Sequence, residues 1–160
     1  MDEQAQQRAT FSRTGVVATM THAVQIRDDF AAWLTQHLVL DPEKTSDIVL
    51  AVNEALANAA EHAYISSSQP GPMHARAEHD PELATLTVWI TDEGRWHVKD
   101  PAIAPNPGRG RGTMLMRALT DRSVVDSMST GTEVRLQWDH VSARVDDTAQ
   151  HAQDDDRLLA

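Results

Sequence analysis

The sequence predicts an α+β fold, a two-layer α/β sandwich in which helices cover one face of a mostly antiparallel, mixed sheet. The expected elements follow the order strand, helix, helix, strand, strand, loop, helix, strand, strand, and so they do not alternate as a doubly wound parallel sheet requires. A length of 160 residues with 41% hydrophobic content suits one globular domain. We expect that domain at residues 11–140, between a flexible arm at 1–10 and an acidic, disordered tail at 141–160.

The first half of the chain predicts a strand and two helices. Ser12–Ala18 is short and partly β-branched, which favours a strand. Apolar residues recur at helical spacing from Thr21 onward, which predicts the first helix. A second helix is expected to begin at Asp41-Pro42, an N-cap followed by proline at the first helical position, and to end near Tyr64.

The second half predicts a strand pair, a long loop, a helix and a final strand pair. In the first pair Leu86, Val88 and Ile90 share one face, since alternate residues of a strand point the same way. The segment that follows is rich in proline and glycine, and a loop of such length inside a compact domain is often functional. The expected ranges are strands Met73–Glu78 and Leu83–Thr91, loop Glu93–Arg111, helix Thr113–Asp121, and strands Ser123–Met128 and Thr132–Trp138.

Charge and composition exclude several classes of protein. The formal net charge of -10 argues against direct nucleic-acid binding, which needs a basic surface. No apolar run approaches a membrane span and no signal peptide opens the chain, so we expect no membrane contact and a cytoplasmic location. Cysteine is absent and the eight histidines form no HExxH pattern, which argues against a zinc site.

The second predicted helix carries the first candidate site residues. Glu54 and Asn58 lie four positions apart and away from the apolar face, so their side chains meet within about 6 Å. A carboxylate and an amide in this arrangement can position a hydrated magnesium ion and a nucleophile. A solvated helix face would show the same pattern. His62, one turn further along, can form a bond near such a site, although a structural role is favoured.

A second candidate is the Asp92-Glu93-Gly94 sequence at the end of an apolar strand. A carboxylate at a strand end can accept a hydrogen bond from an exocyclic amine, and Gly94 allows the backbone to approach a flat ring. A plain turn is the alternative, because aspartate and glycine both favour turns.

A third candidate precedes the predicted third helix. Glycines alternate with two arginines, and a helix N-terminus presents free N–H groups to an anion, so the segment can bind phosphate. A flexible basic loop is the alternative. The segment is neither a Walker A loop nor a dinucleotide fingerprint. Its residues are Gly108, Arg109, Gly110, Arg111 and Gly112. Thr132, at the start of the last strand, can contact a phosphate or simply favour a strand.

The order of these motifs resembles that of the Bergerat-fold ATPases, the superfamily of gyrase, MutL and histidine-kinase catalytic domains. The subgroup it resembles is the anti-sigma-factor serine/threonine kinases. The four family boxes correspond to NEALANAAEHAY, ITDEGRW, GRGTMLMRALTD and GTEVRLQW, and the resemblance covers roughly Arg13 to Trp138.

The resemblance implies ATP and Mg²⁺ as ligands and a role for each matching residue. Glu54 would be the general base, Asn58 the magnesium ligand, Asp92 the adenine reader and Gly94 the residue under the base. Thr132 would lie at the far end of the pocket. The phosphate-binding set would be Gly108, Arg109, Gly110, Arg111, Gly112 and Thr113. The loop would close over bound nucleotide.

Two positions depart from the family pattern. Trp96 replaces a glycine found in many relatives, and Thr113 replaces the usual leucine. The implied function is a kinase that phosphorylates an anti-sigma-factor antagonist and sequesters a sigma factor, and the resemblance also allows a homodimer. The alternative is a nucleotide-binding anti-sigma module without kinase activity. A histidine-kinase catalytic half is disfavoured, because no phosphoacceptor helix pair precedes Thr21.

Overall fold

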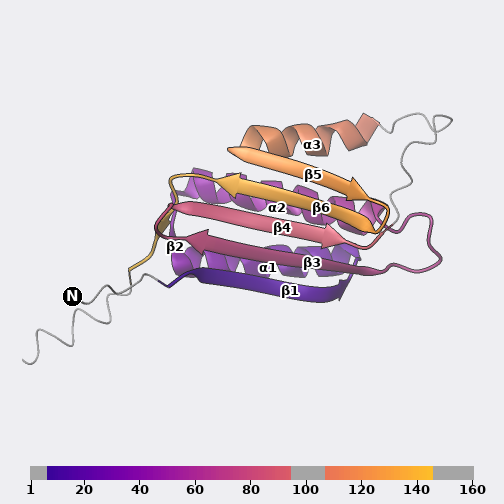
Figure 1. The fold of residues 1–160 in the computed structure, drawn as a ribbon, viewed down its shortest axis with the longest axis horizontal. Helices are drawn as coiled ribbons and strands as arrows, with labels where there is room; N and C mark the ends of the chain where they lie inside the picture. The colour runs from indigo at the N-terminus through magenta and orange to yellow at the C-terminus, as the bar shows by residue number, and fades with distance from the viewer. Residues whose placement is uncertain (1–6, 95–106, 146–160) are drawn as a thin grey trace, which may run out of the picture.

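A computed structural model describes residues 7–94 and 107–145, with the backbone alone for residues 107–112. It confirms the predicted α+β class: helices pack on one face of a five-stranded sheet with the strand order β1-β3-β4-β6-β5 (Figure 1). Every strand pairing within the described residues is antiparallel. The strands of this sheet are β1 (Ala9–Val17), β3 (Pro72–Asp80), β4 (Thr85–Asp92), β5 (Arg122–Met128) and β6 (Gly131–Trp138).

The two long helices begin at the side-chain caps that their sequences supply. In α1 (Met20–His37) the Thr19 hydroxyl accepts the His22 N–H, and in α2 (Pro42–His62) Asp41 accepts the Lys44 N–H at 2.7 Å. Such caps satisfy backbone donors that the first helical turn leaves without partners. Figure 1 shows both helices behind the sheet, running along its strands.

The core lies between the sheet and these helices. In β4 the side chains of Leu86, Val88 and Ile90 are buried, as the alternating pattern predicts. On the opposite face of the same strand, Trp89 lies under the Arg76 guanidinium at 4.0 Å from the ring centre. The helix side also contains a cluster of aromatic rings that joins β1 to α1, formed by Phe11, Phe30 and Trp33.

The segment after β6 is more ordered than the sequence predicts. Ser142–Ala143 forms β7, which pairs with β2 (Leu38–Val39) next to the end of α1. Val141 is buried, and its carbonyl oxygen accepts a hydrogen bond at 2.7 Å from the buried His79 ring. The predicted domain boundary at residue 140 therefore lies too early. The strand β1 likewise begins inside the arm predicted at residues 1–10.

The third helix, α3 (Pro107–Leu119), begins six residues earlier than the sequence predicts. The glycines at 108, 110 and 112 suggested a loop, but Pro107 suits the first helical turn, where its missing N–H needs no partner. The backbone of the glycine-arginine segment is thus the start of the helix itself. None of the described helices is long and apolar enough to cross a membrane.

Candidate functional site

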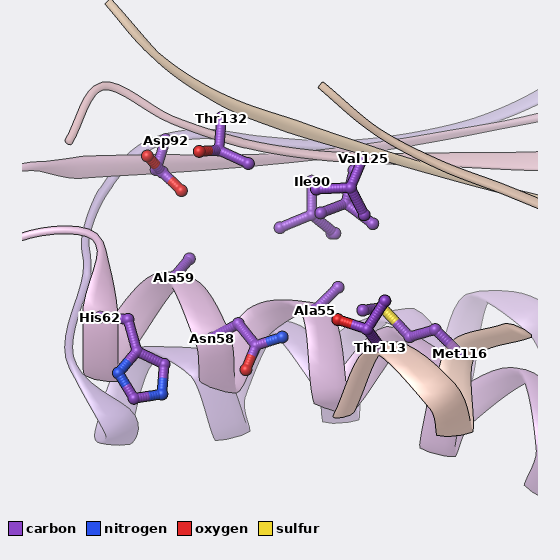
Figure 2. A pocket seen from close by; sticks show the side chains of 11 residues that line it. Ala55, Asn58, Ala59, His62, Ile90, Asp92, Thr113, Met116, Val125 and Thr132 are labelled. Carbon is purple, nitrogen blue, oxygen red and sulfur yellow. The ribbon is translucent and has the colours of Figure 1, made fainter. Parts of the chain in front are cut away.

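A pocket lies between the sheet and α2, with α3 at one end. Figure 2 shows Asp92 and Thr132 side by side on the sheet, with Ala59 of α2 facing them and Thr113 at the opposite end. The lining residues are Ala55, Asn58, Ala59, His62, Ile90, Asp92, Thr113, Met116, Val125, Thr132 and Val134.

One end of the pocket is polar and buried. Asp92 and Thr132 are opposite partners in the β4–β6 ladder, and their exposed fractions are 8% and 6%. One carboxylate oxygen of Asp92 accepts the Gly94 N–H at 3.0 Å. The Thr132 Oγ1 atom is buried and has no hydrogen-bond partner among the described residues. A buried hydroxyl without a partner is unfavourable, so a ligand group that reaches Thr132 can supply the missing hydrogen bond.

The walls next to this polar end are apolar. Ala55 and Ala59 lie on successive turns of α2, where their small side chains leave room below the sheet. Ile90 and Met116 close the pocket from β4 and α3. A flat, mostly apolar ring with an amine at one edge fits these walls, because the amine can donate to the Asp92 carboxylate. Adenine has that chemistry, so the residues present fit an adenine nucleotide.

Of the two candidate site residues on α2, one lines the pocket and the other does not. Asn58 lines the pocket, as does His62, for which the sequence favoured a structural role over one near the pocket. Glu54 lies one helical turn before Asn58 and is half-buried, but it is not among the lining residues. The amide predicted to bind the metal therefore lies in the pocket, whereas the carboxylate predicted as base lies outside its wall.

Glycines hold the backbone around Asp92 in close contact. A Cβ added at Gly94 would lie 2.0 Å from the Ala63 carbonyl oxygen, so this glycine is required by its packing against the residue that follows α2. A Cβ at Gly131 would lie 1.9 Å from the Asp92 carbonyl oxygen, and its φ of +148° is in the region that favours glycine. Both glycines fix the strand ends that carry Asp92 and Thr132.

The predicted phosphate-binding segment is only partly described. Its backbone from residue 108 to 112 belongs to the first turns of α3, and the positions of its side chains lie outside the described residues. Thr113, which departs from the family pattern, lines the pocket. Residues 95–106, which include Trp96 and most of the expected closing loop, also lie outside the description.

Sequence reasoning assigned no role to Tyr64, which the structure places behind the polar end. Its hydroxyl donates to the Pro72 carbonyl oxygen and accepts the Glu93 N–H at 2.9 Å. Burial raises the pKa of Tyr64 above its ordinary value of 10.0. The sequence does single out Tyr64, because it is the only tyrosine in the chain and ends the first family box.

The structure is thus an α+β sandwich with a pocket between sheet and helix that is polar at one end and apolar along its walls. Comparison with protein families identifies it further: residues 16–138 match the histidine kinase-like ATPase domain. Because this match covers most of the chain, the protein belongs to that family. An ATPase domain implies ATP binding.

Two solved structures share the fold. The first contains the RsbU and RsbW domains of Rv1364c from Mycobacterium tuberculosis, with a TM-score of 0.63, 22% identity and coverage of 85% of this chain. This chain spans 33% of that longer chain. The second is the SiaB-SiaC complex from Pseudomonas aeruginosa, with a TM-score of 0.57, 10% identity and coverage of 79% of this chain and 88% of that one.

Proposed function

We propose that the protein binds ATP with Mg²⁺ in this pocket and acts as an anti-sigma serine/threonine kinase. It would phosphorylate an anti-sigma-factor antagonist and sequester a sigma factor. The observation that carries the nucleotide part is the buried pair of Asp92 and Thr132, a carboxylate acceptor beside a hydroxyl that lacks a partner among the described residues. The regulatory part is supported by the resemblance of the four sequence boxes to that subgroup.

The residues take separate roles in this proposal. Asp92 accepts the adenine amine, and Asn58 holds the magnesium ion together with the phosphates. The helix start at residues 108–113 faces the phosphates, which suits the positive end of a helix dipole. Bound ATP supplies the phosphoryl group. Glu54 takes the proton from the attacking hydroxyl of the antagonist, the oxygen–phosphorus bond forms, and ADP leaves.

Protein partners are supported by the neighbours as well as by the sequence. One related fold is an RsbW domain in a chain that also contains RsbU, and the other was solved as the SiaB-SiaC complex. We infer that this chain also works by binding another protein. A homodimer remains a further proposal, as does a cytoplasmic location.

The second candidate function is an ATP-binding anti-sigma module without kinase activity. It is favoured by one observation, the absence of Glu54 from the residues that line the pocket. A base that lies outside the wall needs the partner protein, or a movement of α2, to bring it to the reacting hydroxyl.

Phosphate transfer from radiolabelled ATP to a purified antagonist separates the two functions. Glu54→Gln should slow transfer by roughly 10²- to 10⁴-fold and leave ATP affinity unchanged, because general base catalysis has about that size. Glu43→Gln, an exposed carboxylate in the first turn of the same helix, is the matched control. Equal rates in Glu54→Gln and wild type would remove Glu54 from catalysis. A wild type that binds ATP and antagonist without transfer would support the module.

A further inference from the structure

Tyr64 connects the end of α2 to two strand ends at once. Its hydroxyl donates to the carbonyl oxygen of Pro72, where β3 begins, and accepts the N–H of Glu93, which directly follows β4. In the sheet Met73 is paired with Asp92, so these two strand ends are neighbours. One hydroxyl therefore ties the helix to both strands next to the carboxylate that faces the pocket.

The ring of Tyr64 fits only because of a neighbouring glycine. A Cβ at Gly71 would lie 2.5 Å from the Cε1 atom of the ring, which is well inside contact distance. The residue before Tyr64 touches the same turn, since a Cβ at Gly94 would meet the Ala63 carbonyl oxygen. The turn after Asp92 is thus packed against the two residues that follow α2.

The orientation of Asp92 depends on this turn. Its carboxylate accepts the Gly94 N–H at 3.0 Å, so the backbone at residues 93 and 94 fixes the direction of the carboxylate. Glu93, between the two, is held by the Tyr64 hydroxyl at 2.9 Å. Removal of that hydroxyl would free the backbone that orients the Asp92 carboxylate, without replacing any side chain that lines the pocket.

We infer that Tyr64 is a positioning residue for adenine recognition: its hydroxyl holds the Glu93 backbone so that Asp92 meets the exocyclic amine of the base. The inference rests on the proposed ATP site. Both hydrogen bonds need the neutral hydroxyl, which accepts one and donates the other. Burial raises the pKa of Tyr64, so the hydroxyl keeps its proton at physiological pH.

The test compares ATP with inosine triphosphate, which has a carbonyl oxygen in place of the adenine amine. Binding of each is measured by calorimetry, well below the melting temperature, for wild type and Tyr64→Phe. ATP affinity should fall roughly tenfold, because the Glu93 N–H loses the hydrogen bond that holds the backbone next to Asp92. The affinity for inosine triphosphate should change little, so the preference for ATP shrinks. In the protein without nucleotide, the Glu93 amide should exchange its hydrogen faster than in wild type.

Thr45→Val is the matched control. It removes one hydroxyl that donates to a backbone carbonyl, that of Asp41 at 2.9 Å, at the opposite end of the same helix. A general loss of helix stability would then appear in both variants, whereas a changed preference for ATP over inosine triphosphate should appear only in Tyr64→Phe.

Gly71→Ala gives an independent perturbation of the same contact, because the new methyl group displaces the Tyr64 ring from outside the pocket. It should reduce the preference for ATP in the same direction, and it carries the test if Tyr64→Phe fails to fold. An unchanged preference in both variants, with wild type binding ATP, would overturn the inference. A wild type that binds no ATP would overturn the proposed function and the inference with it.

Discussion

Replacement of Thr132 by valine should make the protein more stable and its ATP binding weaker. The Thr132 hydroxyl is buried and has no partner among the described residues. Leaving such a group without a hydrogen bond costs about 1–3 kcal/mol, and valine has nearly the same shape without the hydroxyl. We expect the free energy of unfolding without nucleotide to rise by about 1 kcal/mol, and the melting temperature to rise by roughly 2–4 °C for a domain of this size.

The same change should remove a group that the ligand uses. A hydrogen bond to bound nucleotide contributes about 0.5–1.5 kcal/mol, so ATP affinity should fall by roughly 2- to 13-fold. Thermal denaturation with and without ATP and Mg²⁺ measures both effects, since a ligand that binds only the folded state raises the melting temperature by mass action. Without ATP the variant should melt at a higher temperature than wild type, and added ATP should raise its melting temperature by less.

Thr87→Val is the control for this prediction. It makes the same substitution in β4, on the face of the sheet opposite the buried Leu86 and Val88 and away from the pocket. The reasoning is refuted if Thr132→Val lowers the stability of the protein without nucleotide while its ATP affinity equals that of wild type. In that case the hydroxyl would be satisfied within the protein and would have no role toward the ligand.

Four further outcomes can be measured. Asp92→Asn should weaken ATP binding strongly and change stability little in calorimetry and melting, because the amide presents a donor where the amine needs an acceptor; equal affinity would move Asp92 out of the site. Asn58→Ala should abolish the dependence of ATP binding on Mg²⁺ in titrations with and without the metal, and a retained dependence would contradict the assignment. Gly131→Ala should destabilise the fold by several kcal/mol in denaturant unfolding, because its Cβ would lie 1.9 Å from the Asp92 carbonyl oxygen; a loss below about 1 kcal/mol would show that the turn adapts. Folding raises the pKa of Tyr64, so the stability that its neutral hydroxyl contributes is complete below pH 10.0 and is lost as pH rises through the pKa of the folded state. In urea unfolding between about pH 8 and 11, Tyr64→Phe should not show this loss of stability.

The fold could be predicted from local patterns, because its strands and long helices carry strong ones. The strand β4 alternates buried and half-buried residues along its whole length, and α2 begins at the Asp41-Pro42 signal. The predicted bounds are wrong in two segments whose composition is typical of loops. Glycines at 108, 110 and 112 concealed the first turns of α3, and polar residues around Val141 concealed a segment that tertiary contacts hold in place.

The site could be predicted only in part, because contact between distant residues is not a local property. The structure brings Asn58, Asp92, Thr113 and Thr132 together in one pocket, although they come from four elements. Glu54 remains outside the wall despite its helical spacing from Asn58, since the spacing fixes the distance between two side chains and not the direction of the pocket. Tyr64 escaped notice because its importance rests on bonds to backbone atoms, which no side-chain pattern reveals.

The pairing of β2 with β7 has a consequence for how the protein is made. Arg144 donates to the carbonyl oxygens of Thr35 and Leu38, the latter 106 residues earlier in the chain, and Val141 receives the bond from His79. A ribosome releases the N-terminal strand and both long helices first. The carbonyl groups of Thr35 and Leu38, at the end of α1, therefore lack these hydrogen bonds until Arg144 has been synthesised. A nascent chain stalled before Val141 would lack both the carbonyl oxygen that His79 contacts and the strand that pairs with β2.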